Sequence, residues 1–377
     1  MFTKRLWLLP ESEDRSLSKV LRGLGRTGIV LLVTVLMILV LALGACGVLA
    51  WGPSSEWTRR FVCTFDESSA MKFVPRMYLP EATVQEYLHP SSKPAGEPED
   101  DLFIELPFED GTQPDVQTTD PALVSADPVQ QPADGLQSGE WLEVINMKGP
   151  SFKGKMMIIH DPSKVIVGTL DAYGAAYHGL YLHEFIEKYN AIGGTNAGGF
   201  YDPNGVGNGG TPDGLVIRNG QIAWGSATGW YINVIGFDAN NVLHVGDMSG
   251  QQALDLGMTS AVSFSPGPVL VKDGVKRTGL GGGMNPLTCI GQRQDGTILL
   301  MVLEGRKPDS LGATYDDIAQ IMYDYGAVNA ANLDGGSSSS LYYNDEYLMT
   351  SVTLYYANSS WRLPTAFLVK SAQEGGN

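Results

Sequence analysis

The sequence predicts an α+β protein with a mixed, largely antiparallel sheet core, few helices and an internal pseudo-repeat, preceded by an N-terminal transmembrane helix. Three observations predict this class. Many short apolar stretches are separated by turn dipeptides, a few stretches have helical period, and one long uncharged apolar segment lies near the start of the chain. The 46 glycines fit the tight turns that such a sheet needs.

The long apolar segment runs from Gly28 to Ala50 and contains no charged residue, a length that spans a bilayer as a helix. Residues 1–27 are basic, so the positive-inside rule places them in the cytoplasm and everything after Trp51 outside the cell membrane. A cleaved signal peptide is disfavoured because the apolar run is too long. Residues 43–46 (LGAC) resemble a lipoprotein cleavage box, and lipidation of the cysteine is the alternative anchor.

Composition divides the part after the apolar segment into three. Residues 51–90 form a membrane-proximal segment with helical hints near residues 84–88. Residues 91–140 are acidic and rich in proline, which predicts a disordered spacer, with an acidic interaction tail as the alternative. Residues 141–377 form the one well-patterned globular domain. The net charge of -16 disfavours nucleic-acid binding.

Strands and hairpin turns dominate the predicted domain. Strands are expected at residues 156–159, 164–167, 215–217, 233–237, 268–271, 289–293 and 298–303. Three dipeptides are typical of two-residue hairpin turns, where both central residues need positive φ: Asn219-Gly220, Asp273-Gly274 and Asp295-Gly296. Helices are expected at residues 180–189, near 251–256 and at 315–325.

The stretch from Gly312 to Ser340 is the most informative part of the domain. It predicts a helix, a short apolar strand, and then Asp334 followed by two glycines and four serines. A carboxylate placed where a strand opens into a Gly/Ser loop lies beside backbone amides and hydroxyls, which suits an anionic or sugar substrate. A flexible polar turn is the alternative.

An earlier stretch repeats this order of helix, strand and glycine-flanked polar loop. Aligning EKYNAIGGTNAGG with YDYGAVNAANLDGG places Tyr189 on Tyr325 and Asn196 on Asn332. Repeated units of this kind predict a pseudo-symmetric domain whose two polar loops converge on one cleft. Chance similarity between two Gly/Ala-rich strands is the alternative.

Four blocks in this order resemble the phosphodiester glycosidase family. They are NAGGFYD (196–202), DGLVIRNGQI (213–222), NPLTCIGQRQDGTILLMVLEGR (285–306) and NLDGGSSSSLYYN (332–344). The resemblance covers roughly residues 150–372 and implies an N-acetylglucosamine-1-phosphodiester alpha-N-acetylglucosaminidase-like domain. Two positions depart from the family pattern. Glu304 stands where Asp is frequent, and the stretch 361–366 lacks an Asn that the family's last strand often carries.

Polar residues at predicted strand ends make up the candidate site. Cleavage of a sugar-1-phosphodiester needs a carboxylate at the oxocarbenium-like centre, and Asp334 and Glu304 are the predicted catalytic acids, with Asp334 preferred. A structural ion pair at the Glu304–Arg306 corner is the alternative. Arg306 and the loop amides are expected to hold the phosphate, and the asparagines to orient sugar hydroxyls. The substrate-binding residues predicted are Asn196, Asp202, Arg293, Arg306, Asn332, Gly335, Gly336, Ser337 and Ser338.

No metal ligand set and no cofactor are expected, with a divalent cation at the oxygen-rich stretch 202–208 as the alternative. A Cys63–Cys289 disulfide is conceivable, but Cys289 fits better as a buried small hydrophobe. The expected partners are a phosphorylated glycan or glycopolymer and the membrane. The resemblance to membrane-anchored bacterial proteins implies a hydrolase of cell-envelope or exopolysaccharide glycans. A non-catalytic phosphoglycan-binding module and a glycosyl transferase are the alternatives.

Overall fold

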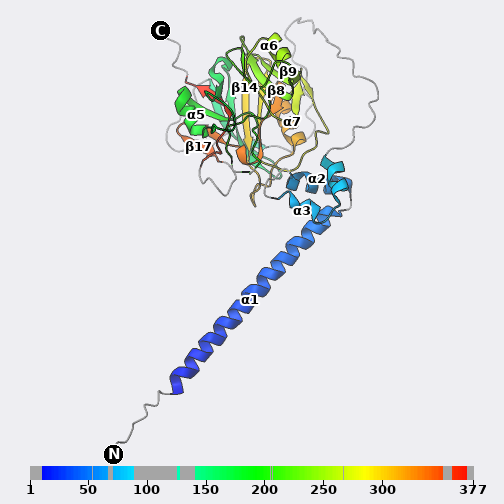
Figure 1. Ribbon diagram of the computed structural model, residues 1–377, viewed down its shortest axis with the longest axis vertical. Helices are drawn as coiled ribbons and strands as arrows, with labels where there is room; N and C mark the ends of the chain where they lie inside the picture. The colour runs from blue at the N-terminus through cyan, green and yellow to red at the C-terminus, as the bar shows by residue number, and fades with distance from the viewer. Residues whose placement is uncertain are drawn as a thin grey trace, which may run out of the picture.

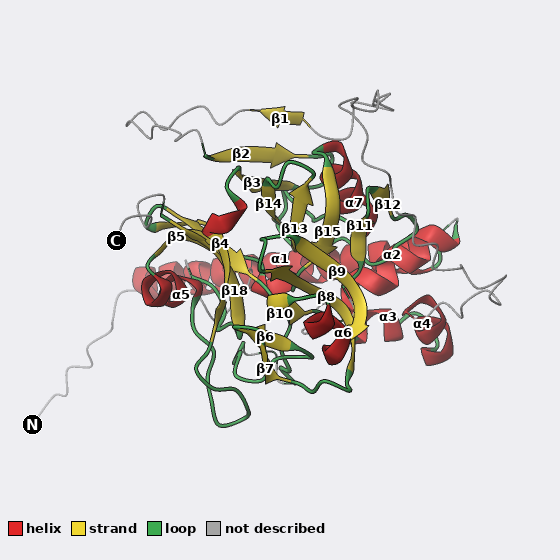
Figure 2. Cartoon of the chain, turned by 90° about the horizontal axis from the view of Figure 1, so that it is seen from above, coloured by secondary structure: helices red, strands yellow, loops and turns green. Residues whose placement is uncertain are grey.

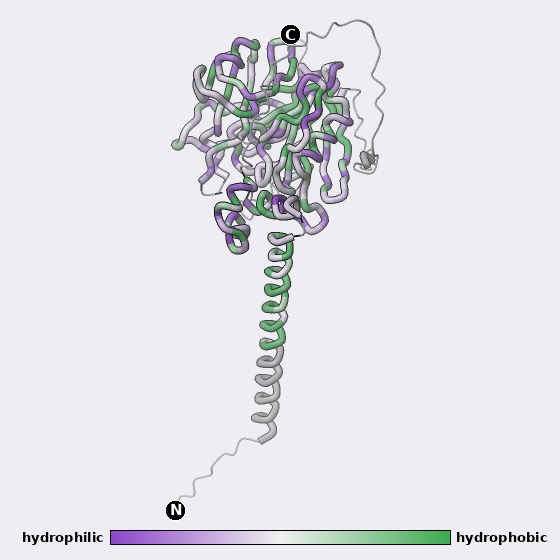
Figure 3. The backbone as a smooth tube through the Cα atoms, turned by 90° about the vertical axis from the view of Figure 1, so that its right-hand side faces the viewer, coloured by the Kyte–Doolittle hydropathy of each residue, from purple (hydrophilic) through white to green (hydrophobic). Residues whose placement is uncertain are grey.

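The structure is a computed structural model that describes residues 11–52, 54–66, 71–88, 125–127, 141–203, 205, 207–265, 267–350 and 359–371. One long helix leads through a group of short helices into a body of β-sheets (Figure 1). The long helix α1 covers Glu11–Ala50, and its part Gly28–Ala50 is long and apolar enough to cross a membrane, with a mean hydropathy of 3.1. Figure 3 shows this apolar stretch standing clear of the body.

Three short helices follow α1 and pack against its end. They are α2 (Ser55–Asp66), α3 (Phe73–Arg76) and α4 (Glu81–Leu88), the last at the position where the sequence gives helical hints. Their shared apolar core also includes Ala50 at the end of α1. We call α2, α3 and α4 the platform.

Three sheets make up the body, and every strand pair in the described part of the chain is antiparallel. The largest has the order β1 (Ser125–Asp127), β2 (Leu142–Lys148), β3 (Lys153–Ile159), β14 (Ile298–Leu303), β13 (Leu287–Arg293), β15 (Ala327–Asn332), β11 (Val269–Lys272) and β12 (Val275–Lys276). The second has the order β7 (Gln221–Trp224), β6 (Val216–Arg218), β10 (Met258–Ser263), β8 (Trp230–Asp238) and β9 (Leu243–Ser249). The third has the order β17 (Glu346–Met349), β16 (Leu341–Tyr343), β5 (Ala191–Asn196), β18 (Thr365–Lys370) and β4 (Val165–Thr169).

The main apolar core lies between the three sheets and takes side chains from all of them. Successive positions of β14 alternate between this core and a second core, so that Leu300 and Val302 face inward while Leu299 and Met301 face the other side. Helix α7 (Tyr315–Asp324) packs on that outer side, and α5 (Leu182–Tyr189) covers the third sheet (Figure 2). Helix α6 (Gly250–Asp255) packs on the second sheet. The α+β class with few helices and an antiparallel core is therefore confirmed.

The predicted pseudo-repeat has a structural counterpart. Helix α5 leads into β5, helix α7 leads into β15, and each strand is paired on both sides. Thr314 and Asp317 form a capping box at the start of α7, and Gly326 after the helix has φ 81°. The two units therefore deliver Asn196 and Asn332 to the carboxyl ends of strands in two different sheets.

Some local expectations were wrong. Ser125–Asp127, inside the expected structureless spacer, forms β1 and pairs with Asn146–Lys148, because an open sheet edge accepts a strand through backbone bonds alone. Asp295 does not have positive φ, and Gly296 donates to the Arg293 carbonyl, so this hairpin has a longer loop than the two-residue turn expected. The polar strands β9 and β10 were not predicted. The remainder of residues 91–140 lies outside the described residues.

Candidate active site

Asn196, at the end of β5, joins the two repeat units. Its side-chain amide donates to the Asp334 carbonyl at 2.5 Å, and its oxygen accepts from the Thr288 hydroxyl and the Ser340 backbone N–H at 3.0 and 3.1 Å. The Asp334 backbone N–H in turn donates to the Ala197 carbonyl at 2.9 Å. Asn196 is completely buried, so its amide holds the two loops together.

Asp334 lies at the point where these loops meet. Its side chain is partly accessible but closely surrounded by protein, and this desolvation raises the pKa of the carboxyl to about 7. The nearby carboxylates of Asp213 and Asp202 raise this pKa further, while the Ser338 side chain and the Gly335 backbone oppose the shift. A carboxyl group with a pKa near neutrality is suited to acid or base chemistry.

Arg306 brings a positive charge to the same turn. Its Nη2 donates to the Asn285 side-chain oxygen at 3.0 Å, and its Nη1 donates to the Ser337 hydroxyl at 3.4 Å. Arg306 has φ 58°, a left-handed conformation unusual for a side-chain-bearing residue. The Gly336 backbone N–H donates to the Pro286 carbonyl, which fixes the Gly335–Ser338 turn beside this corner. The guanidinium and the Asp334 turn are thus neighbours.

Glu304, the other predicted acid, is engaged elsewhere. Its carboxylate forms an ion pair with Lys307 at 2.5 Å, and Lys307 and Ser310 close a short loop beside it. The Lys153–Asp309 ion pair lies in the same charged neighbourhood, since Glu304 contributes to the raised pKa of Lys153. Glu304 thus forms a structural ion pair at this corner, but its partner is Lys307, whereas Arg306 donates to Asn285 and Ser337.

Arg293 does not belong to the group around Asp334. It ends β13, whose first residue, Leu287, lies beside Gly335, and six residues of extended strand separate the two ends by about 20 Å. Its Nε donates to the Tyr325 carbonyl at 2.6 Å, and its side chain lines an open hollow with Asp295. The structure therefore does not bring Arg293 to the group around Asp334, and its contact with the substrate stays a prediction. The local sequence pattern does not say which end of a strand bears the site.

Asn332, the counterpart of Asn196, has a different environment. It is completely buried, and both its side-chain oxygen and nitrogen lack a hydrogen-bond partner among the described residues. Asn233 on β8 has a left-handed backbone conformation, and its side-chain nitrogen donates to the Asn332 carbonyl at 2.8 Å. The Asn233 side-chain oxygen also has no hydrogen-bond partner among the described residues. Buried amides of this kind are rare unless a ligand or another group completes them.

Several residues of this region were missed from the sequence. Asp213 has its pKa raised by burial and acts electrostatically on Asp334. Asp213 begins the DGLVIRNGQI block, and this place in a block of the family resemblance could have marked it as a site residue. Its Asp-Gly pair, however, resembles an ordinary turn. Thr288 and Asn285 hold Asn196 and Arg306, and although both lie in the block 285–306, neither stands at the end of a predicted strand.

Asp202 accepts a hydrogen bond from the Gly207 backbone N–H at 2.8 Å, within the stretch weighed as a cation loop. Residues 204 and 206 of that loop lie outside the described residues. Among the residues that the structure does describe, no group of three or more His, Cys, Asp or Glu side chains is arranged to hold a metal ion. No disulfide joins Cys46, Cys63 and Cys289, so the Cys63–Cys289 bridge is not formed, and Cys289 is buried as expected.

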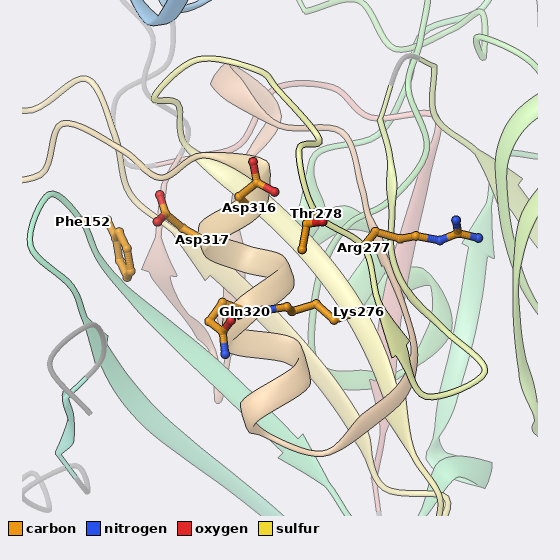
Figure 4. Close-up of a pocket in the computed structure, with 7 residues that line it drawn as sticks. All are labelled: Phe152, Lys276, Arg277, Thr278, Asp316, Asp317 and Gln320. Atoms are coloured by element: carbon orange, nitrogen blue, oxygen red, sulfur yellow. Dashed lines mark hydrogen bonds between the residues drawn. The ribbon is translucent and has the colours of Figure 1, made fainter. Parts of the chain in front are cut away.

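A separate cavity of about 230 Å³ lies beside α7. Figure 4 shows Asp316 and Asp317 at the first turn of the helix, with Gln320 one turn further along and Lys276 beside it. Lys276 and Gln320 are hydrogen-bonded to each other. None of the predicted site residues lines this cavity, so it is distinct from the region around Asp334.

Residues 189–370 match the family described as phosphodiester glycosidase. The fold is similar to that of the zebrafish N-acetylglucosamine-1-phosphodiester alpha-N-acetylglucosaminidase catalytic domain, with a TM-score of 0.50 and 18% identity over 66% of this chain and 88% of that one. A hypothetical protein from Synechocystis has a TM-score of 0.40 and 18% identity, over 62% of this chain and 64% of that one.

Among curated proteins, the SPbeta prophage-derived uncharacterized protein YomE of Bacillus subtilis (strain 168) is 37% identical over 92 residues. This match covers 23% of the chain and only 14% of YomE. The family match confirms the resemblance seen in the four sequence blocks over residues 189–370.

Proposed function

We propose that this protein, whose residues 189–370 carry a phosphodiester glycosidase domain, hydrolyses a sugar-1-phosphodiester of the N-acetylglucosamine type in envelope or exopolysaccharide glycans. The helix Gly28–Ala50 anchors it in the cell membrane with the body outside. The observation that carries this proposal is the convergence of Asp334 and Arg306 on one short turn, Gly335–Ser338, between the two repeat units.

Each group has a role that its chemistry supports. Arg306 and the amides and hydroxyls of the turn bind the phosphate, because a guanidinium matches phosphate oxygens with two parallel donors. A phosphate is already a good leaving group, so it gains more from this charge than from a strong acid. Asp334 acts in its ionised form, either by activating water or by supporting the oxocarbenium-like centre.

The neighbouring groups support these roles. Asp213 and Asp202 raise the pKa of Asp334 and thereby make it a better base at neutral pH. Asn332 lies two residues before Asp334, and its amide is completely buried and has no partner within the described structure, so it contacts a sugar hydroxyl or acetamido group only where substrate binding opens the surrounding loop. Asn196, by contrast, is committed to holding the loops, and Glu304 to its ion pair with Lys307.

The test uses N-acetylglucosamine-α-1-phosphate methyl diester and purified full-length protein in detergent. Wild type is expected to release free N-acetylglucosamine, and Asp334→Asn to release at least about 100-fold less. Adding a chelator distinguishes a metal-dependent reaction from a metal-independent one. A folded Asp334→Asn protein with full activity would remove Asp334 from the mechanism.

A non-catalytic module that binds phosphorylated glycans is the second candidate, and the orphaned buried amide of Asn332 is consistent with it. Binding of the diester without release of sugar would favour this function. A transferase would form product only when an acceptor sugar is added.

A further inference from the structure

The platform contacts the body at a loop close to the candidate site. The Thr64 hydroxyl on α2 accepts a hydrogen bond from the Met284 backbone N–H at 3.0 Å. A Cβ atom at Gly283 would lie 2.3 Å from the Thr64 backbone nitrogen, so the two backbones touch here. A Cβ atom at Gly281 would likewise clash with the Arg59 guanidinium. Helix α2 therefore packs directly on the loop that precedes β13.

The same loop leads immediately to the proposed phosphate-binding residues, which are Arg306 and the turn Gly335–Ser338. Asn285 follows Met284 and accepts the hydrogen bond from Arg306, and the Pro286 carbonyl accepts from Gly336. Two residues of chain reach at most about 7 Å. The proposed phosphate-binding group of Asn285, Arg306 and the Gly335–Ser338 turn is therefore roughly one side-chain length from the platform, whose helices α2 and α3 lie between α1 and the body (Figure 1).

The platform is also fixed to the end of the membrane span. A helix of 23 residues is about 35 Å long, enough to cross a hydrocarbon core of about 30 Å. The span ends at Ala50, which is buried in the platform core with Phe61, Val62 and Val84. The helices α2–α4 consequently begin where the bilayer ends.

Large apolar side chains remain exposed on the platform and in the short link between α1 and α2. Trp51 is 71% exposed and Trp57 55%, and on α3 and just after it Phe73 and Met77 are 57% and 58% exposed. They are not part of the platform core. Tryptophan and phenylalanine immediately after a span are typical of side chains that lie in the headgroup layer of a bilayer.

We propose that the platform lies in the outer headgroup layer and holds the site over the membrane, so that the substrate is a membrane lipid whose phosphate carries a sugar at C1. This inference rests on the proposed hydrolase function. Water adds its oxygen to C1 of the sugar, the bond from C1 to the phosphate oxygen breaks, and the lipid remains in the bilayer as a phosphate monoester. One proton of the water passes to Asp334 and then to solvent.

The test compares two substrates in phosphatidylglycerol-containing vesicles that carry the full-length protein with its body outside. One is N-acetylglucosaminyl phosphoryl polyprenol in the same bilayer, and the other is the soluble methyl diester. A second protein carries Ala50→Asp, which removes the apolar contact between the end of the span and the platform core, together with about 16 Gly/Ser residues inserted after Gly52, which then let the platform move about 20 Å from the bilayer. The residues of the candidate site are not changed in this protein.

Wild type is expected to cleave the lipid-borne substrate, and the insertion to slow this at least tenfold while cleavage of the methyl diester stays within twofold. A Trp51→Ser/Trp57→Ser double variant is expected to show the same selective loss. Cleavage of the methyl diester without cleavage of the lipid, or equal rates for wild type and insertion, would overturn the inference but leave the hydrolase function intact. No cleavage of either substrate by wild type would overturn both.

Discussion

The Asn196 side-chain amide donates a 2.5 Å hydrogen bond to the Asp334 backbone carbonyl, across 138 positions of sequence. This bond joins the end of β5 in one sheet to the end of β15 in another. The Asn196 oxygen is fully used as well, by Thr288, Ser340 and the Thr195 hydroxyl. The residue therefore connects the two repeat units at the position where the proposed catalytic carboxyl emerges.

Asn196→Ala is expected to destabilise the protein by about 2–4 kcal/mol, because four hydrogen bonds are lost and their buried partners are left unpaired. The measurement is urea unfolding followed by tryptophan fluorescence. Asn240→Ala is the matched control, since Asn240 is exposed, and it should change the free energy of unfolding by less than about 0.5 kcal/mol. Equal effects of the two variants would contradict the joining role of Asn196.

Asp334→Asn is expected to lower kcat by about 10²–10⁴ while the protein remains folded, since a positioned carboxyl contributes in this range. Asp255→Asn, at an exposed carboxylate on α6, serves as the control and should leave kcat within twofold. The assay follows release of N-acetylglucosamine from the methyl diester. A loss of activity shared by both variants would point to the loss of a surface charge instead.

The pKa of about 7 at Asp334 predicts two pH dependences with a defined sign. If the ionised carboxyl acts, kcat/KM rises with pH through about 7, and a decrease over this range would assign the protonated form. The folded state also binds this proton more tightly than the unfolded chain, whose value is near 3.8. The free energy of unfolding should therefore fall as pH rises from about 4 to 7, by at most about 4 kcal/mol from this group.

The stability part of this prediction is checked by urea unfolding of wild type and Asp334→Asn at pH 5 and pH 8. The variant cannot ionise at this position, so the difference in unfolding free energy between the two proteins should shift in favour of the variant at pH 8. An unchanged difference would mean that burial does not hold the proton on Asp334.

Features of the fold and the site that depend on neighbouring residues could be predicted from the sequence, whereas contacts between residues far apart in the chain could not. The helical period and capping box of α7 and the Gly/Ser turn after Asp334 are contained within about 30 residues, and the repeat alignment brought Asn196 to the same place. Thr288 and Asn233 reach the site only through pairing of distant strands. A strand pattern alone does not say which of its ends lies at a site, and only the three-dimensional arrangement shows that Leu287 begins the end of β13 near Gly335 while Arg293 ends the other.

Arg306 and Glu304 are close in sequence but should differ sharply in mutational effect. Arg306→Lys is expected to raise KM for the diester about 10–100-fold, because an ammonium cannot contact Asn285, Ser337 and a phosphate with the fork geometry of the guanidinium. Glu304→Gln removes a partly exposed ion pair and should change kcat and KM less than about threefold. Steady-state kinetics on both variants is the measurement, and a large fall in kcat for Glu304→Gln would support its predicted catalytic role.

Asn332 and Asn329, on the same strand β15, provide the clearest contrast between binding and folding. Both Asn329 side-chain atoms are used, by the Leu243 carbonyl and the Asp273 backbone N–H, whereas neither atom of Asn332 has a partner in the described structure. An unpaired buried amide contributes little to folding, so Asn332→Ala should change the free energy of unfolding by less than about 1 kcal/mol and raise KM roughly tenfold. Asn329→Ala should show the reverse, with a loss of about 1–3 kcal/mol and an unchanged KM. If Asn332→Ala unfolds the protein and leaves the KM of the folded fraction unchanged, the amide serves the core and does not contact the sugar.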